Sequence, residues 1–227
     1  MSLSQEERKI MVEVELEHES VVYLNEWYPE LKVIEADFLK LNLDELYPEG
    51  EFSVIGNYPY NISSQIFFKV LEYKDRIGVC SGMLQKEVAE RLASKPGTKA
   101  YGILSVLLQA WYDIEYLFTV DKQLFNPVPK VQSAVIRLTR NRRRQLDCDE
   151  GFFKTVVKTA FNQRRKQMRN SLKGVMGYGL RGTGDAQRQK TAALKDERLE
   201  WFLTKRPEQL DVEEFVELTK LLQSCRN

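Results

Sequence analysis

The chain has 227 residues, of which 43% are hydrophobic, so it is long enough to bury an ordinary protein core. No apolar run reaches the roughly 20 residues that a membrane span needs, and the charged start is unlike a signal peptide. Three widely separated cysteines and a single histidine argue against a disulfide framework, a zinc site and a histidine-based triad. We therefore expect a cytoplasmic protein with reduced thiols and no metal.

Charge is distributed unevenly along the chain. Residues 1–140 carry 15 basic and 21 acidic side chains, whereas residues 141–227 carry 19 and 12. Residues 151–184 contain eight basic side chains and no acidic one, which creates a local field that attracts phosphate groups. An ordinary solvated helix face explains the charge equally well, so charge alone leaves the partner open.

Strand-like and helix-like segments alternate in the first 140 residues. The predicted strands are residues 9–16, 31–34, 51–56, 77–84, 116–120 and 133–139. The predicted helices are residues 19–27, 61–73, 86–93 and 101–111. Asn61 or Ser63 is the predicted cap of the second helix. This alternation predicts an α/β fold with a mostly parallel, doubly wound sheet.

The basic turn at residues 140–144 predicts a domain boundary, so we expect one domain over residues 1–144 and a second, all-helical one over residues 145–227. The helices predicted in the second domain are residues 150–172, 196–203 and 212–222. The glycine-rich residues 174–184 lack the Gly-Lys-Ser/Thr ending of a phosphate-binding loop and are interpreted as a flexible connector.

The segment Asn57, Tyr58, Pro59, Tyr60 follows the strand predicted at residues 51–56, where ligands bind in an open α/β sheet. Its residue types suit chemistry on an exocyclic aromatic amine, whose delocalised lone pair needs hydrogen-bond acceptors before it can attack. The Asn57 side chain and the Tyr58 carbonyl could accept, Pro59 stiffens the turn, and Tyr60 offers a ring for base stacking. A plain proline turn with a buried tyrosine is the alternative.

Two carboxylates stand where a nucleotide-like cofactor would need them. Glu15 ends the first predicted strand, where a carboxylate commonly binds ribose hydroxyls. Asp37 follows the second strand and could accept from an adenine amino group while Phe38 packs on that ring. Each is an ordinary surface carboxylate in the alternative interpretation, but their order before Asn57 favours a cofactor site.

The helix predicted at residues 150–172 carries a basic stripe next to an apolar one. The basic stripe consists of Lys154, Lys158, Arg165, Arg169 and Lys173, at steps of 4, 7, 4 and 4. Arg164 lies in the apolar phase, so we expect it to pair with an acidic residue of the first domain or to line the cleft. The exposed face predicts phosphate contacts, and an amphipathic helix docked on the first domain is the alternative.

Seven segments in order resemble the KsgA-type family of rRNA adenine dimethyltransferases: residues 14–17, 35–38, 56–63, 83–88, 99–105, 125–134 and 160–166. The resemblance implies a Rossmann-like methyltransferase sheet that uses S-adenosylmethionine, followed by a small all-α domain. It also implies dimethylation of N6 of two adjacent adenines in the hairpin near the 3-prime end of small-subunit (16S) rRNA. The implied partner is that rRNA or the immature small ribosomal subunit. We expect the protein to be a monomer and not to associate with a membrane.

The resemblance also implies roles for individual residues. Glu15 would hold the cofactor ribose, Asp37 and Phe38 its adenine, and Asn57 with Tyr60 the target amine, with Asn57 also next to the cofactor. Phe125 would lie near the target base. The residues expected to contact RNA are Lys154, Lys158, Arg164, Arg165, Lys166 and Arg169.

Members of that family begin with a first strand and a Gly-x-Gly-type loop, neither of which is found in this sequence. We therefore expect an incomplete catalytic domain over residues 1–144 that binds the cofactor weakly and is inactive in methyl transfer. One alternative is a noncatalytic RNA-binding ribosome-assembly factor that has lost its cofactor loop. A methyltransferase for an unrelated small amine is a third interpretation, which the basic second domain opposes.

Overall fold

The computed structural model describes residues 11–176 and 196–225. The chain forms two compact units, Met1–Phe52 and Ser53–Asn227. Residues 177–184 of the predicted glycine-rich connector lie outside the described residues. Within the described ranges, no helix combines the length and the apolar character that a membrane crossing needs.

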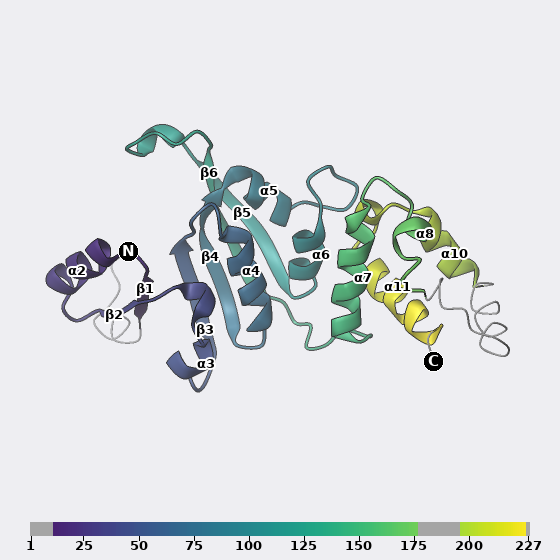
Figure 1. Cartoon of the computed structure of the whole chain (residues 1–227), viewed down its shortest axis with the longest axis horizontal. Coiled ribbons are helices and arrows are strands. Elements are labelled where there is room, and N and C mark those ends of the chain that lie inside the picture. Colours follow the sequence, from purple (N-terminus) through teal and green to yellow (C-terminus); the bar gives the residue numbers. More distant parts are fainter. Residues whose placement is uncertain (1–10, 177–195, 226–227) are drawn as a thin grey trace. The chain divides into compact units, whose positions relative to one another are not determined.

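The first unit contains a strand–helix–strand arrangement (Figure 1). Strands β1 (Val12–Glu15) and β2 (Lys32–Glu35) pair in parallel and are joined by helix α2 (His18–Trp27). Two short helical segments follow, η1 (Phe38–Lys40) and α3 (Leu43–Leu46). Because the two strands are parallel, both end at the same edge, where Glu15 lies opposite Glu35.

The second unit contains a four-stranded sheet in the order β3-β4-β6-β5. Its strands are β3 (Phe52–Asn57), β4 (Ile77–Gln85), β5 (Tyr112–Val120) and β6 (Ser133–Arg140). Strand β6 runs antiparallel to both β4 and β5, so the prediction of a mostly parallel sheet is wrong for this half. The reason is that β5 and β6 form a hairpin through residues 121–132, which include the turn η2 (Lys122–Leu124), instead of a helical crossover.

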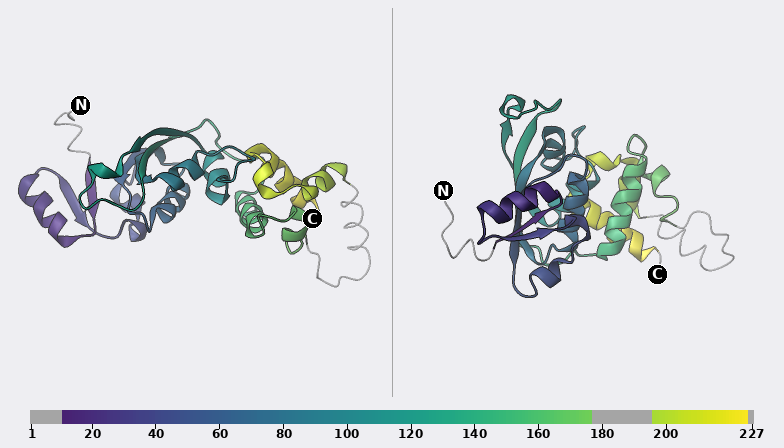
Figure 2. Two further views of the ribbon diagram at one scale, coloured as in Figure 1. Left: turned by 90° about the horizontal axis from the view of Figure 1, so that it is seen from above. Right: turned by 60° about the vertical axis from the view of Figure 1, so that its left-hand side comes forward.

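Three helices pack against this sheet: α4 (Ser63–Glu72), α5 (Lys86–Leu92) and α6 (Ile103–Gln109) (Figure 2). The core between them consists of fully buried apolar side chains, among them Phe67, Val70, Leu84, Leu108, Ile136 and Leu138. The predicted caps of α4 are wrong, because the cap residue is Ile62 and its side chain makes no capping bond. The Ser63 hydroxyl instead donates to the Tyr60 carbonyl at 3.3 Å, which ties the helix to the preceding turn.

The C-terminal part of the second unit is helical, as predicted. Its elements are α7 (Glu150–Asn162), α8 (Met168–Ser171), α10 (Glu197–Thr204), η3 (Pro207–Gln209) and α11 (Val212–Ser224). Helix α7 contacts α6, α8 and α11, and α11 also contacts α6. These contacts join the C-terminal helices to the helical layer of the sheet.

The prediction of a single helix over residues 150–172 is wrong. Helix α7 ends at Asn162, and α8 begins only at Met168. The Met168 side chain is fully buried, and its backbone N–H donates to the Lys205 carbonyl at 2.8 Å. Tertiary packing of Met168 therefore redirects the chain and divides the predicted basic stripe among α7, the loop of residues 163–167, and α8.

Candidate functional site

Tyr58 anchors the turn that follows β3. Its side chain is 5% exposed, its hydroxyl donates to the Ser81 carbonyl at 2.8 Å, and its ring lies edge-on to Phe67. Its backbone N–H donates to the Met83 carbonyl at 2.9 Å. Since the side chain points into the core, only the carbonyl of Tyr58 is in a position to act on a ligand.

Gly82 on β4 makes the space that the Tyr58 ring occupies. A Cβ atom at Gly82 would lie 2.3 Å from the Gly56 carbonyl oxygen and 2.6 Å from the Tyr58 ring. Burial raises the pKa of the Tyr58 hydroxyl, and it raises the pKa of the neighbouring Cys80 thiol to about 12. Both groups therefore stay protonated at neutral pH and hold the turn as neutral hydrogen-bonding groups.

Tyr60 is fixed by a residue far away in the sequence. Its hydroxyl lies 2.6 Å from the hydroxyl of Ser133, a fully buried residue at the start of β6. Pro59 lies between the two tyrosines and is exposed. Residue types alone did not predict a role for Ser133 at this site. The sequence pointed to it only as part of the segment 125–134 that resembles the family.

The polar acceptors expected from the sequence remain available. The Asn57 side chain is exposed, and neither it nor the Tyr58 carbonyl oxygen has a hydrogen-bond partner among the described residues. The two acceptors belong to adjacent residues, and the Tyr60 ring follows two positions later. This arrangement can accept two N–H hydrogens from an amine beside a ring that can stack on a base.

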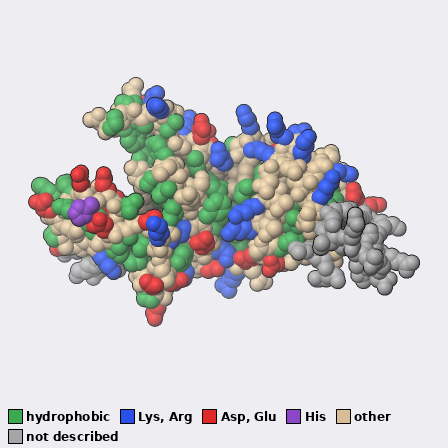
Figure 3. Space-filling model, in the orientation of Figure 1, with side chains coloured by type: hydrophobic (Ala, Val, Ile, Leu, Met, Phe, Trp, Pro, Cys, Tyr) green, Lys and Arg blue, Asp and Glu red, His purple; other side chains and the backbone are tan. Residues whose placement is uncertain are grey.

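The β5–β6 hairpin projects near this turn. Val120 pairs with Ser133 at its base, so the contact between Tyr60 and Ser133 brings the turn to the base of the hairpin. Phe125 is half-buried at the end of η2, and Figure 3 shows hydrophobic side chains on this projection, where Leu124 is 79% exposed. No contact of Phe125 with Tyr60 is found among the described residues, so its role at the target base stays a prediction.

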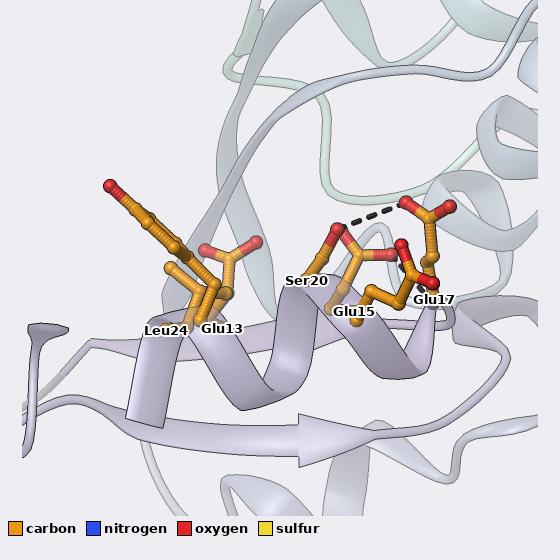
Figure 4. A pocket seen from close by; sticks show the side chains of 7 residues that line it. Glu13, Glu15, Glu17, Ser20 and Leu24 are labelled. Atoms are coloured by element: carbon orange, nitrogen blue, oxygen red, sulfur yellow. Dashed lines mark hydrogen bonds between the residues drawn. The ribbon is translucent and has the colours of Figure 1, made fainter. Parts of the chain in front are cut away.

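Glu15 lies beside an open acidic cavity of the first unit (Figure 4). The cavity has a volume of about 570 Å³ and is lined by Glu13, Glu15, Glu17, Glu19, Ser20, Tyr23 and Leu24. One carboxylate oxygen of Glu15 accepts the backbone N–H groups of Leu16 and Glu17, at 2.7 and 2.9 Å. Burial, followed by the charge of Glu15, raises the pKa of Glu13. The second Glu15 oxygen can accept from a hydroxyl.

Asp37 also divides its carboxylate between two tasks. One oxygen caps η1 by accepting the Leu39 N–H at 3.0 Å, and the other lies 3.6 Å from the Lys40 Nζ. Phe38 is the first residue of η1 and is half-buried. An adenine amino group would have to share an oxygen with the exposed Lys40, so the adenine contact of Asp37 and Phe38 stays a prediction.

The six basic residues expected to bind RNA are in different environments. Lys154 is exposed on α7, while Lys158 places its Nζ 5.2 Å from the centre of the Phe68 ring. Arg169 on α8 lies 3.6 Å from the Glu200 carboxylate. Arg165 and Lys166 are exposed in the loop of residues 163–167.

Arg164 was expected to pair with an acidic residue or to line the cleft. It forms no ion pair among the described residues, and its Nη2 donates to the backbone carbonyl of Thr98 at 3.2 Å, while its place in the cleft stays a prediction. The bond spans two loops that are 66 positions apart in the sequence. Arg164 therefore has a defined structural contact in addition to its charge.

The model of the family described as ribosomal RNA adenine dimethylase matches residues 4–220. The chain belongs to this family. It is 62% identical over 212 residues to a protein of Parabacteroides distasonis named ribosomal RNA small subunit methyltransferase A, covering 92% of this chain and 74% of that protein. It is 55% identical over 225 residues to a Bacteroides fragilis protein of the same name, covering 98% and 77%.

Two solved structures share the fold. A dimethyladenosine transferase from Plasmodium falciparum has a TM-score of 0.70 at 22% identity, covering 91% of this chain and 79% of that one. The 23S rRNA methyltransferase ErmE has a TM-score of 0.60 at 26% identity, covering 93% and 81%. These similarities confirm the predicted α/β methyltransferase fold, and the family match confirms the resemblance seen in the sequence.

Proposed function

We propose that this protein dimethylates N6 of two adjacent adenines in the hairpin near the 3-prime end of small-subunit (16S) rRNA, as part of small-subunit maturation. The observation that carries the proposal is the turn after β3. Its Asn57 side chain and Tyr58 carbonyl have no hydrogen-bond partner among the described residues, and Ser133 fixes the Tyr60 ring next to them. The relatives named small-subunit methyltransferases support the choice of rRNA.

The chemistry follows from the nature of the adenine amine. Its nitrogen lone pair is delocalised into the ring, so it is a poor nucleophile until the amine becomes pyramidal. Acceptance of its two hydrogens by Asn57 and by the Tyr58 carbonyl would favour that geometry, and stacking on Tyr60 would fix the base, with roughly 1 to 3 kcal/mol from the stacking. The amine would take the methyl group of the donor as the methyl–sulfur bond breaks, which leaves the donor as a neutral thioether, and one amine proton would be lost to solvent. Positioning of this kind requires no general base or metal.

S-adenosylmethionine would be the methyl donor, and it supplies a methyl group made electrophilic by its sulfonium. The first unit fits the adenosine part of this molecule, because the free Glu15 oxygen faces an open cavity where hydroxyl groups can bind. Asp37 and Phe38 would bind the adenine, and Asn57 would lie next to the donor. We assign these tasks to a catalytic domain of residues 1–144.

RNA would bind to the helical domain of residues 145–227. Lys154, Arg165 and Lys166 are exposed and free of acidic partners among the described residues, which supports direct phosphate contacts. Lys158 and Arg169 would contribute at the edge of this surface, and Arg164 would support it by its bond to the Thr98 carbonyl. We propose a monomer that meets the immature small subunit in the cytoplasm.

The proposal is tested by methyl transfer to small-subunit particles that lack the modification, with the labelled nucleosides identified by mass spectrometry. We expect dimethyladenosine with a form of the protein that also carries the family's first strand and Gly-x-Gly-type loop. We expect its loss when that form carries Asn57→Ala, while RNA binding stays nearly intact. Residues 1–227 alone are expected to transfer little or no methyl, as the sequence predicts. Asn25→Ala changes an exposed asparagine on α2 and serves as the matched control. RNA binding by the longer form without any methyl transfer would instead support the noncatalytic assembly factor.

A further inference from the structure

Two loops that carry basic side chains are hydrogen-bonded to each other in the second unit. One connects α5 to α6 (residues 93–102), and the other connects α7 to α8 (residues 163–167). The Arg164 guanidinium donates to the Thr98 carbonyl at 3.2 Å. The Gly97 N–H donates to the Glu208 carbonyl at 2.6 Å, so the first loop has a second bond to the C-terminal segment.

The α5–α6 loop is also stabilised by hydrogen bonds from α6 and within the loop itself. The buried Ser105 donates to the Arg91 carbonyl at 2.6 Å, and the Gln109 amide donates to the Ser94 carbonyl at 2.8 Å. The Thr98 hydroxyl donates back to the Lys95 carbonyl at 2.9 Å. Gly97 permits this tight turn because its φ is +83°, a conformation that L side chains rarely adopt. The backbone that carries the loop's lysines is thus fixed.

Each of the two loops carries two exposed basic side chains. Lys95 and Lys99 are exposed on the α5–α6 loop, and Arg165 and Lys166 are exposed on the α7–α8 loop. None of the four forms an ion pair with any residue in the described ranges, whereas Arg169 pairs with Glu200. Figure 3 shows Lys and Arg side chains gathered over the part of this unit that contains α6 and α7.

We infer that Lys95 and Lys99 belong to the same phosphate-binding surface as Arg165 and Lys166, and that Arg164 is the positioning residue that joins its two halves. The inference rests on the proposed RNA substrate. These four cations have no acidic partner in the described part of the chain, and the two loops that carry them are hydrogen-bonded to each other. They can therefore neutralise neighbouring phosphates of one RNA segment without first becoming ordered. Arg164 contributes by its bond to Thr98, since that bond holds the lysine-bearing loop against the loop that carries Arg165.

The inference is tested by the salt dependence of binding of a synthetic RNA hairpin that reproduces the 3-prime end of small-subunit rRNA. Each lost phosphate contact should reduce the slope of log affinity against log salt by roughly 0.7 to 0.9. We therefore expect Lys95→Ala/Lys99→Ala to reduce the slope by about twice that amount. The control Lys32→Ala/Lys220→Ala removes two positive charges as well, and Lys220 forms an ion pair with Asp147. Because neither lysine lies on the two loops, this control should leave the slope almost unchanged.

A thermodynamic cycle with Arg164→Ala separates positioning from direct contact. If Arg164 acts through the loop, the triple variant will have the slope of the lysine double variant, because the lysines are already gone. If Arg164 itself contacts phosphate, the triple variant will lose a further contact, which would overturn its positioning role. If the Arg164→Ala variant does not fold, Arg164→Gln replaces it in the same cycle.

The remaining outcomes distinguish this inference from the proposed function. An unchanged slope for the lysine double variant, in a protein that still binds and methylates RNA, would overturn only the inference. Failure of the unchanged protein to bind the hairpin would overturn both.

Discussion

The Tyr60 hydroxyl lies 2.6 Å from the Ser133 hydroxyl, although 73 positions separate the two residues in the sequence. This contact connects the turn that carries Asn57 to the first residue of β6. It fixes the far end of the ring on which the target base would stack, so the orientation of Tyr60 depends on the β5–β6 hairpin as well as on its own turn.

Ser133→Ala should therefore reduce methyl transfer without removing any group that touches the substrate. We expect kcat to fall about fivefold, since loss of one hydrogen bond of about 1 kcal/mol loosens the ring. Tyr60→Phe removes the same bond and should give a similar loss, and the double variant should be no worse than either single one. Steady-state kinetics would check this, and additive losses would contradict a shared contact.

Glu15→Gln should weaken binding of S-adenosylmethionine. One Glu15 oxygen is occupied by two backbone N–H groups, and glutamine keeps only one acceptor oxygen for both the backbone and the ribose. We expect Kd to rise roughly tenfold or more, in line with loss of a charged hydrogen bond. Calorimetric titration would measure it. Glu19→Gln changes another carboxylate of the same cavity and should have little effect.

Arg165→Ala should weaken RNA binding more than Arg169→Ala does. Arg165 is exposed and has no acidic partner among the described residues, whereas Arg169 already lies 3.6 Å from Glu200. We expect the salt slope to fall by roughly 0.7 to 0.9 for Arg165→Ala and by less for Arg169→Ala. Equal slopes for the two variants would show that the Glu200 contact is broken when RNA binds.

The local order of the candidate site could be predicted from the sequence, whereas its tertiary support could not. Asn57 is the last residue of β3 and Tyr60 follows it, and ligands commonly bind at such strand ends. Ser133 could not be assigned to Tyr60, because nothing in local periodicity reports a contact across the sheet. For the same reason, the antiparallel direction of β6 was missed.

The break after α7 shows a second limit of sequence patterns. Helical spacing of basic and apolar residues continues through residues 163–167, where no proline or glycine interrupts it. The helix ends because the chain turns to bury Met168 and to bond the Lys205 carbonyl. Local propensity is a weak prior that such packing overrides. Arg164 was consequently assigned to a helix face, whereas it lies in a loop and bonds Thr98.

Gly82→Ala should destabilise the second unit. A methyl group at this position would lie 2.3 Å from the Gly56 carbonyl oxygen, and backbone atoms cannot move aside as a flexible side chain can. We expect a loss of about 1 to 3 kcal/mol, typical of an overpacked core, measured by urea unfolding. Gly151→Ala on α7 is the control, because its new methyl group would meet nothing closer than 3.4 Å. Equal stability of the two variants would contradict the close packing at Gly82.

The buried Cys80 thiol should make stability fall at high pH. Burial raises its pKa from 9.0 to about 12, so the folded protein keeps the proton over a range in which the unfolded chain loses it. Its contribution is complete below pH 9 and is lost as the pH rises from there to about 12. We expect the urea midpoint of the unchanged protein to fall more between pH 8 and pH 11 than that of Cys80→Ala. Cys225→Ala, which changes a partly exposed thiol, should follow the unchanged protein, and a parallel decline in all three would refute the role of Cys80.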